Sequence, residues 1–375
     1  MPRVAIVKCK SYGKSEVSRA FNEVFDLLGG FESIFKKNEE VLVKPNLLGA
    51  NKPEEGTTTH PNTLRALLKI LQEHEMPIYV GDSPGIVKAE EKVFRVTRTR
   101  EVLNEMKVDG GFFKEMEEVR NTEFFSKNIR LAKKALEADA IVSLARFKTH
   151  SQTFFTGAMK NLFGCMPGKL KAYMHVEHLK IEDFAEMIVD INVALKPRLG
   201  IIDAVKAMEG PDGPTRGNLR NMGVILASRD LLALDVVAQR LVGISVDDAP
   251  ISKMARRRKF GVGDISKIDV VGEKIENVEM PDFDVVDKRR QIPDIFPKFV
   301  KRIMADSVIG KPIFLHGKCN LCRNCVEICP VKALNVVDGK IRIDYKKCIR
   351  CHCCFETCPR AAIELKKGIL AKFRS

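Results

Sequence analysis

The sequence predicts an α/β fold, with a largely parallel sheet and flanking helices, followed by a small cysteine-rich α+β domain. Strand-like and helix-like segments alternate over residues 1–285, the order that builds a parallel sheet covered on both faces. Pro293 and Pro297 interrupt residues 286–312, which read as a linker with one short helix. Residues 313–375 hold nine of the eleven cysteines, eight of them in two runs of one spacing. We therefore expect two domains joined by this linker.

The expected strands are short apolar runs that end in polar residues or glycine. In chain order they are RVAIVK, EEVLVKPNLL, PIYVGDSPG, ADAIVSLARFK, RLGIIDAV, NMGVILAS and KIDVVG. Apolar residues at helical spacing predict helices in EVSRAFNEVFDLL, PNTLRALLKILQEH and RDLLALDVVAQRLVG. The first of these helices ends at Gly29-Gly30 and the second begins at Pro61, which is typical of helix ends and helix starts.

The C-terminal cysteines form two copies of one pattern, C-x2-C-x2-C-x3-C followed by proline. This run holds the cubane clusters of two-cluster bacterial ferredoxins, in which the fourth cysteine of each run ligates the other cluster. We therefore expect two [4Fe-4S] clusters. The expected ligand sets are Cys319, Cys322, Cys325 and Cys358 for one cluster, and Cys348, Cys351, Cys354 and Cys329 for the other.

Two other readings of these cysteines fit the pattern less well. Structural zinc sites use two C-x2-C pairs separated by a longer stretch, rather than two full runs of four. A disulfide framework belongs to short secreted chains, whereas this chain is long and begins without a signal-peptide pattern. Between the runs, alternating residues around Asp338-Gly339 predict a β-hairpin.

Three cysteines fall outside the expected ligand sets. Cys353 lies between two ligands, where it could be an alternative ligand, a redox-active thiol or a bystander. Cys9 and Cys165 lie far upstream. Cys165 stands in LFGCMPGK, and a loop cysteine near lysines can have a lowered pKa, although a small semi-buried side chain is the simpler reading.

Composition and charge favour a globular protein with anionic partners. The chain has 375 residues and a formal net charge of +14, with basic runs at 256–259, at 288–290 and around 95–100. It has neither a helix-turn-helix pattern nor an aromatic RNA-binding motif, and it has no tryptophan, so nucleic acid is not the expected partner. We expect an acidic redox partner protein or an anionic small molecule instead.

Hydropathy bears on where the protein works. No apolar stretch reaches the roughly 18 residues that a membrane-spanning helix needs, so membrane insertion is not expected. The N-terminal residues lack the apolar core of a signal peptide. We therefore expect a cytoplasmic protein.

Ionisable residues that follow the predicted strands are candidate catalytic groups. In open parallel sheets, ligands bind beyond the carboxyl ends of the strands. Lys148 and His150 follow one strand, Asp82 follows another, and Asp203 ends a third. Histidine can move a proton near neutral pH, and a carboxylate can orient the groups around it. Asp82 also lies in Gly-Asp-Ser-Pro-Gly, where aspartate and serine commonly cap turns.

The same edge of the sheet offers residues that could bind a substrate. Lys44 and Asn46 follow the second strand, and Lys160 and His175 lie in a later turn-rich stretch. Lysines suit a carboxylate or a phosphate. His175 lies three residues before His178, so the pair could also ligate a metal ion, although such spacing more often marks a solvated helix face.

Two nucleotide-binding motifs are not present. YGKS follows the first strand and resembles the end of a phosphate-binding loop, but Lys8 occupies the position where that motif needs glycine. No G-x-G-x-x-G follows a predicted strand, so nicotinamide binding has no support.

Several motifs together resemble one known family. They are VKPNLL, GDSPG, FKTH followed by TGAMKNLFG, IIDAV and GPDGP. They are similar to the large domain of an uncharacterised iron–sulfur family, which carries only a domain-of-unknown-function label and often has a two-cluster ferredoxin module appended. The resemblance spans nearly the whole chain and implies an α/β fold and iron–sulfur clusters. It implies no substrate.

Three functions fit these expectations. The first is an electron-transfer protein that acts as a redox enzyme, or as a subunit of one, on an anionic small molecule at the strand-end pocket. The second is a non-enzymatic, ferredoxin-like carrier that docks to a partner redox enzyme. The third is a maturation factor for another metalloprotein, in which Cys165 and Cys353 take part in transfer.

Overall fold

The computed structural model describes all residues except 85–89, 122, 128, 287–309 and 367–375. The chain divides into two compact units. The first comprises Met1–Lys171 and Lys180–Val286, and the second comprises Ala172–Leu179 and Asp287–Ser375. The linker expected at 286–312 lies almost wholly outside the described residues, and so does the basic run at 288–290.

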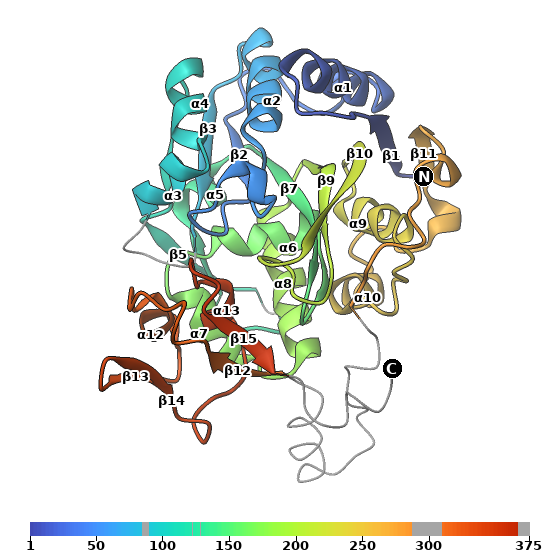
Figure 1. Cartoon of the computed structure of the whole chain (residues 1–375). Helices are drawn as coiled ribbons and strands as arrows, with labels where there is room; N and C mark the ends of the chain where they lie inside the picture. The colour runs from blue at the N-terminus through green and yellow to red at the C-terminus, as the bar shows by residue number, and fades with distance from the viewer. Residues whose placement is uncertain (85–89, 122, 128, 287–309, 367–375) are drawn as a thin grey trace. The chain divides into compact units, whose positions relative to one another are not determined.

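The first unit is built on a mixed sheet that has nine strands within the described residues (Figure 1). Their order is β11-β1-β10-β9-β7-β2-β3-β4, with β8 paired to β7. The strands are β1 (Arg3–Lys8), β2 (Val41–Pro45), β3 (Ile78–Asp82), β4 (Asp109–Phe112), β7 (Ala140–His150), β8 (Phe154–Thr156), β9 (Leu199–Glu209), β10 (Asn218–Ser228) and β11 (Asp269–Gly272). All seven segments expected to be strands contain one.

Most strand pairs are parallel, which confirms the predicted fold class. The pairs β11-β1, β9-β7, β7-β2, β2-β3 and β3-β4 are parallel. The strand β10 is antiparallel to both of its neighbours, and β8 is antiparallel to β7. The turn-rich segment 210–217 joins β9 directly to β10 without a crossover helix, so β10 must return antiparallel.

Helices cover both faces of this sheet (Figure 1). The helices α1, α2 and α4 pack on one face with α3, and α6, α8, α9 and α10 pack on the other with α5. Their bounds are α1 (Lys14–Leu27), α2 (Pro61–Glu73), α3 (Glu90–Val96), α4 (Thr99–Met106), α5 (Lys133–Glu137), α6 (Ala158–Asn161), α8 (Ile181–Leu195), α9 (Leu231–Arg240) and α10 (Pro250–Arg257). A separate two-stranded sheet joins β5 (Met116–Val119) to β6 (Ile129–Ala132).

Alternation along the strands explains the two layers of helices. On β2, Val41 and Val43 belong to the apolar core that α1 and α2 share, and on β7 Val142 and Leu144 do so. Intervening residues face the other side: the Ser143 hydroxyl donates to the carbonyl of Ala158 in α6 at 2.8 Å. Both faces of the central strands are therefore buried, as expected for parallel strands.

The second unit contains two short β-pairs and three short helices among its described residues. The strands β12 (Lys311–Phe314) and β15 (Ile363–Lys366) are antiparallel, and so are β13 (Leu334–Val337) and β14 (Lys340–Ile343). Its helices are α7 (Leu170–Glu177), whose first two residues belong to the other unit, α12 (Asn324–Ile328) and α13 (Cys353–Glu356). The predicted hairpin is confirmed: Asp338 and Gly339 turn between β13 and β14 with φ of 49° and 66°.

The two cysteine runs adopt matching backbone conformations. Positive φ angles occur at Leu321 and Arg323 in the first run, and at Arg350 and His352 in the second. A short helix starts directly after Arg323 in one run and after His352 in the other. The sequence repeat is therefore also a structural repeat.

Candidate cluster site and strand-end site

Thiols from both runs surround Cys325 in the second unit. Burial, together with the neighbouring thiols of Cys322, Cys358 and Cys319, raises the pKa of Cys325 to about 12. Cys358, the last cysteine of the second run, thus lies beside the first three cysteines of the first run. This grouping is the one expected for the first ligand set.

The other four cysteines line one cavity in the same unit. Its empty volume, including space open to solvent, is about 340 Å³. Cys348, Cys351 and Cys354 of the second run line it together with Cys329 of the first run. Cys353 also reaches the lining.

The donor set and its surroundings fit iron–sulfur clusters. None of the described cysteines forms a disulfide. Backbone N–H groups of Ala333 and Ala362 donate to the sulfurs of Cys329 and Cys358, both at 3.2 Å, and such bonds stabilise thiolates that ligate iron. In the described part of the chain, no group of three or more histidine, cysteine, aspartate or glutamate side chains is arranged to hold a single metal ion. Four cysteines around one cavity suit a cluster, which brings its own sulfide. The assignment of individual ligands stays a prediction.

The remaining cysteines are not poised as thiolates. Burial raises the pKa of Cys9 to about 12, and it does the same for Cys165 although Lys44 and Lys171 lie nearby. The lowered pKa considered for Cys165 is therefore not found. The pKa of the Cys353 thiol is also raised, mainly by its hydrogen bond with the Cys351 thiol and then by burial.

The strand-end site in the first unit contains a buried ion pair between two adjacent parallel strands. Lys44, on β2, places its ammonium 2.7 Å from a carboxylate oxygen of Asp82, the last residue of β3. The ammonium also donates to the carbonyl of Pro45 at 2.7 Å and to the side-chain oxygen of Asn161 in α6 at 3.4 Å. The Asp82 carboxylate accepts from the N–H groups of Leu47 and Ser83, both at 2.7 Å. Both oxygens of the Asp82 carboxylate therefore have partners, and Asp82 acts as a group that positions Lys44.

Lys171 borders this ion pair. Its ammonium donates to the carbonyl of Ser83. Burial, helped by the nearby Lys44 ammonium, lowers the pKa of Lys171 to about 8, although the Asp82 carboxylate acts in the opposite direction. A lysine with such a pKa is partly neutral near physiological pH and can accept a proton.

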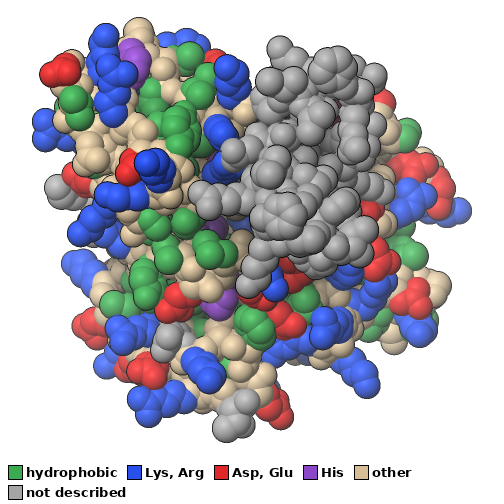
Figure 2. Space-filling model, turned by 90° about the horizontal axis from the view of Figure 1, so that it is seen from below, with side chains coloured by type: hydrophobic (Ala, Val, Ile, Leu, Met, Phe, Trp, Pro, Cys, Tyr) green, Lys and Arg blue, Asp and Glu red, His purple; other side chains and the backbone are tan. Residues whose placement is uncertain are grey.

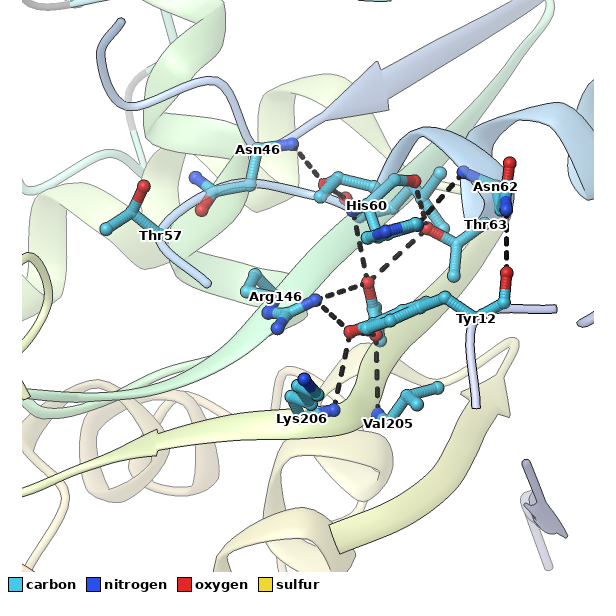
Figure 3. A network of polar contacts seen from close by, with 12 residues as sticks. Tyr12, Asn46, Thr57, His60, Asn62, Thr63, Arg146, Val205 and Lys206 are labelled. Carbon is cyan, nitrogen blue, oxygen red and sulfur yellow. Dashed lines mark hydrogen bonds and ion pairs between the residues drawn. The ribbon is translucent and has the colours of Figure 1, made fainter. Parts of the chain in front are cut away.

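A second buried network surrounds Asp203 on β9 (Figure 3). Arg146, at the paired position on β7, donates to its carboxylate at 2.7 Å, and neither side chain is exposed to solvent. The Tyr12 hydroxyl donates to the other oxygen at 2.8 Å and also contacts the same Arg146 nitrogen. The N–H of His60 donates to Asp203 at 3.2 Å. One carboxylate therefore ties together three distant segments.

His60 lies between the network and helix α2. Its ring stacks on Tyr12, with centroids 3.6 Å apart and planes 10° apart. Its Nδ1 accepts from the N–H of Asn62 at 3.1 Å, which caps the helix and leaves the proton on Nε2. Burial lowers the pKa of His60 to about 4, so the ring is neutral at physiological pH.

Lys148 connects the strand ends to the loop that follows β2. Its ammonium donates to the side-chain oxygen of Asn46 at 2.7 Å and to the carbonyl of Thr57 at 2.6 Å. The Asn46 N–H in turn donates to the Thr59 hydroxyl at 2.8 Å. Lys148 and Asn46 thus come together as the sequence led us to expect, because β2 and β7 are neighbours.

Three other candidates lie elsewhere. His150 ends β7, and its Nδ1 accepts from the N–H groups of Gln152 and Thr153 at 3.1 and 3.3 Å, as in a turn cap. Lys160 is in α6, one residue before Asn161. His175 is in α7, within the segment that belongs to the second unit.

Sequence comparisons place the chain in a family. Residues 41–240, more than half of the chain, match the family described as Domain of unknown function (DUF362). The chain belongs to the DUF362 family. Residues 311–359 of this DUF362 protein match the 4Fe-4S dicluster domain. The second unit therefore carries an iron–sulfur domain of the ferredoxin type, which serves electron transfer.

A curated relative and two solved structures are similar to this DUF362 protein. A thylakoid-associated protein of Synechocystis sp. is 33% identical over 260 residues, which is 69% of this chain and 79% of that protein. The lactate racemase apoprotein from Thermoanaerobacterium thermosaccharolyticum aligns with a TM-score of 0.42 at 14% identity, over 65% of this chain and 57% of that one. A Thermotoga maritima protein aligns with a TM-score of 0.37 at 13% identity, over 57% and 55%. The chain spans just over half the length of each solved structure.

Sequence reasoning missed several residues of the strand-end site. Arg146 is hidden inside the apolar run of its strand, and Tyr12 and His60 lie in loops before helices. The only sign of Arg146 was a charge within a strand otherwise buried on both faces, where an unpaired charge is costly. Lys171 gave no sign at all, because its lowered pKa comes from tertiary burial.

The basic runs of this DUF362 protein are partly neutralised. Arg98 pairs with Glu101, and Arg100 pairs with Glu91 at 2.9 Å. In the basic run at 256–259, Arg258 pairs with Asp190 and Glu186. On the face shown in Figure 2, Lys and Arg side chains are dispersed among Asp and Glu side chains. Within the described residues, no helix is both long and apolar enough to cross a membrane.

Proposed function

We propose that this DUF362 protein carries two [4Fe-4S] clusters and uses them in a redox reaction on an anionic small molecule. The two sets of four cysteines described above would hold the clusters, and the clusters would supply single electrons. The substrate would bind at the strand-end site of the α/β unit. A cytoplasmic location remains a prediction alongside this proposal.

One observation carries the proposal: three cationic side chains are buried at the strand ends of a chain that also has an electron-transfer domain. Lys44, Arg146 and Lys148 are each 1% exposed or less. Removing such charges from water costs several kcal/mol per ion unless partners compensate (about 20 by idealised estimates). Asp82 and Asp203 compensate two of these cations, and all three lie towards the carboxyl ends of parallel strands, where ligands of such sheets bind.

The side chains would divide the work as follows. Lys148 would attract the anion, while Asp82 holds Lys44 and Asp203 holds Arg146 in place. His150 would move a proton, and Lys171 is a further proton acceptor because its pKa is about 8.

A reoxidation experiment tests this proposal. The full chain is purified anaerobically, reduced with dithionite, and mixed with a panel of small carboxylates and phosphates while cluster absorbance is followed. At least one compound should reoxidise the clusters, and Lys148→Met should slow this at least about tenfold, the effect of a lost charge-assisted hydrogen bond. Lys206→Met, which alters an exposed lysine on β9, is the matched control. No reoxidation by any compound would remove the enzymatic part of the proposal.

The net charge supports a second candidate, a carrier that docks to an acidic redox partner. With a formal charge of +14, the chain would associate with an acidic protein at a rate that falls steeply with salt. Anaerobic electron transfer to an acidic acceptor protein, measured from low to high salt, distinguishes the two. Reduction of the acceptor without any small-molecule turnover would favour the carrier.

The third candidate, a maturation factor, finds less support. It needs transferable thiolates, whereas Cys165 is fully buried with a raised pKa.

A further inference from the structure

Arg146 has one edge of its guanidinium group without a partner. Its Nη1 donates to Asp203 and contacts Tyr12, whereas buried Nε and Nη2 meet no acceptor among the described residues. The side chain is 0% exposed, so bulk water does not satisfy them.

These two nitrogens form a matched pair. Nε–H and one N–H of Nη2 lie parallel on the same side of the planar guanidinium, at the spacing of the two oxygens of a carboxylate. Buried donors without acceptors are rare in folded proteins because leaving one unpaired destabilises the fold. Asp203 and Tyr12 meanwhile fix the other side of the group, so the free edge is held in one orientation.

Two further buried groups without partners lie in the segment beside Arg146. The hydroxyls of Thr57 and Thr58 have no hydrogen-bond partner in the described structure, and both residues are 0% exposed. Both ends of the segment 57–60 are hydrogen-bonded to residues of this site. The carbonyl of Thr57 accepts from Lys148, and the N–H of His60 donates to Asp203, the partner of Arg146.

Lys148 adds positive charge on the same side of the strand. It lies two residues after Arg146 on β7, so the two side chains leave the same face. Its ammonium donates to two neutral oxygens, those of Asn46 and Thr57. Two cationic side chains therefore leave this face of β7 beside the segment 57–60.

We propose that the Nε/Nη2 edge of Arg146 binds the carboxylate group of a small organic acid, covered by the threonine segment 57–58. The inference rests on the proposed function and names the substrate class and the binding group for it. Carboxylate oxygens would accept from the Arg146 edge and from the threonine hydroxyls. The anion enters when the segment 57–60 moves away from β7, because the binding edge is buried when that segment is in place.

Binding is measured on the full chain with its clusters left oxidised and no electron donor present. Acetate, succinate and inorganic phosphate are titrated by calorimetry, and their stabilisation of the protein is followed by thermal melting. We expect a carboxylate to bind. Arg146→Lys, which keeps the charge but loses the planar edge, should weaken that binding at least about tenfold. Arg198→Lys is the control, because Arg198 already bonds Glu39 and backbone carbonyls.

Thr57→Val is a second variant, one that is expected to fold and therefore allows carboxylate binding to be measured. Valine has the shape of threonine without the hydroxyl, so removing a buried hydroxyl that has no partner should leave the ligand-free melting temperature unchanged or raise it. The same variant should reduce the stabilisation by carboxylate. A fall in ligand-free stability would show that the hydroxyl is already satisfied, which would overturn the inference.

The outcomes separate this inference from the proposed function. Binding of phosphate in preference to both carboxylates, equal carboxylate binding by Arg146→Lys, or no binding at all would overturn the inference. Cluster reoxidation by a compound that still binds to Arg146→Lys would leave the redox proposal standing without it. Carboxylate binding that requires Arg146, with no reoxidation by any compound, would support the inference and remove the enzymatic proposal.

Discussion

The ammonium of Lys44 and the carboxylate of Asp82 lie 2.7 Å apart at the ends of two adjacent parallel strands, and their side chains are only 1% and 4% exposed. Because β2 and β3 run in the same direction, residues that end the two strands meet at the same edge. The pair also holds Asn161 of α6 and the loop after β2. It is therefore a structural anchor for the strand-end site.

Breaking this pair should destabilise the first unit strongly. Asp82→Ala leaves the Lys44 ammonium buried without its counter-charge, and such changes cost about 3–5 kcal/mol. Chemical denaturation of the reconstituted full chain measures this loss. The exposed pair Lys69–Glu73, 3.6 Å apart on α2, is the control, and Glu73→Ala should change stability by less than about 0.5 kcal/mol. Similar losses in both variants would contradict the anchoring role.

Gly164 should not tolerate a side chain. A Cβ atom there would come within 2.6 Å of the Lys44 ammonium and closer still to a carboxylate oxygen of Asp82. Gly164→Ala must therefore displace the ion pair, at a cost of about 1–3 kcal/mol for overpacking. Gly13→Ala is the matched control, because a Cβ there meets nothing closer than 3.4 Å. A melting temperature for Gly164→Ala equal to that of the native chain would show that the site has room there.

Cys358 and Cys353 should differ sharply in their effect on iron content. Cys358 lies beside Cys325 and belongs to the first predicted ligand set, so Cys358→Ala should lower the iron content from about eight to about four atoms per chain. Cys353→Ala should retain the full content. Iron and acid-labile sulfide are assayed after anaerobic purification. Loss of iron in Cys353→Ala alone would mean that Cys353 is a ligand.

Lys171 should titrate well below an ordinary lysine. Burial lowers its pKa from 10.5 to about 8, and Asp82 holds it from falling further. After reductive ¹³C-methylation, NMR of the oxidised protein should show one lysine that titrates near pH 8 and is missing in Lys171→Arg. Asp82→Asn should move that pKa lower.

The same shift has a consequence for stability. The unfolded chain binds this proton more tightly than the folded chain, so the Lys171 contribution to stability is fully present above pH 10.5 and is lost as the pH falls through about 8. A titration of Lys171 near pH 10.5, with no such pH dependence, would contradict its burial.

Sequence reasoning found what local patterns determine. The spacing of Cys319 to Cys358, the hairpin at Asp338-Gly339 and the alternating strands and helices depend on short segments, and the structure has them. Lys44, Asp82 and Lys148 could be proposed as site residues from the sequence because residues after parallel strands share one edge. Arg146 and Tyr12 were missed because their roles depend on contacts between segments more than a hundred residues apart along the chain. Lys171 was missed for the same reason, and the reversed direction of β10 follows from a connection whose path the sequence pattern does not show.

Low-temperature EPR of the anaerobically purified, dithionite-reduced full chain tests the central claim most directly. The account predicts a brown protein whose reduced spectrum shows two magnetically coupled [4Fe-4S] centres, since the two cysteine sets lie in one small unit. A colourless preparation that contains zinc and has no EPR signal would contradict it.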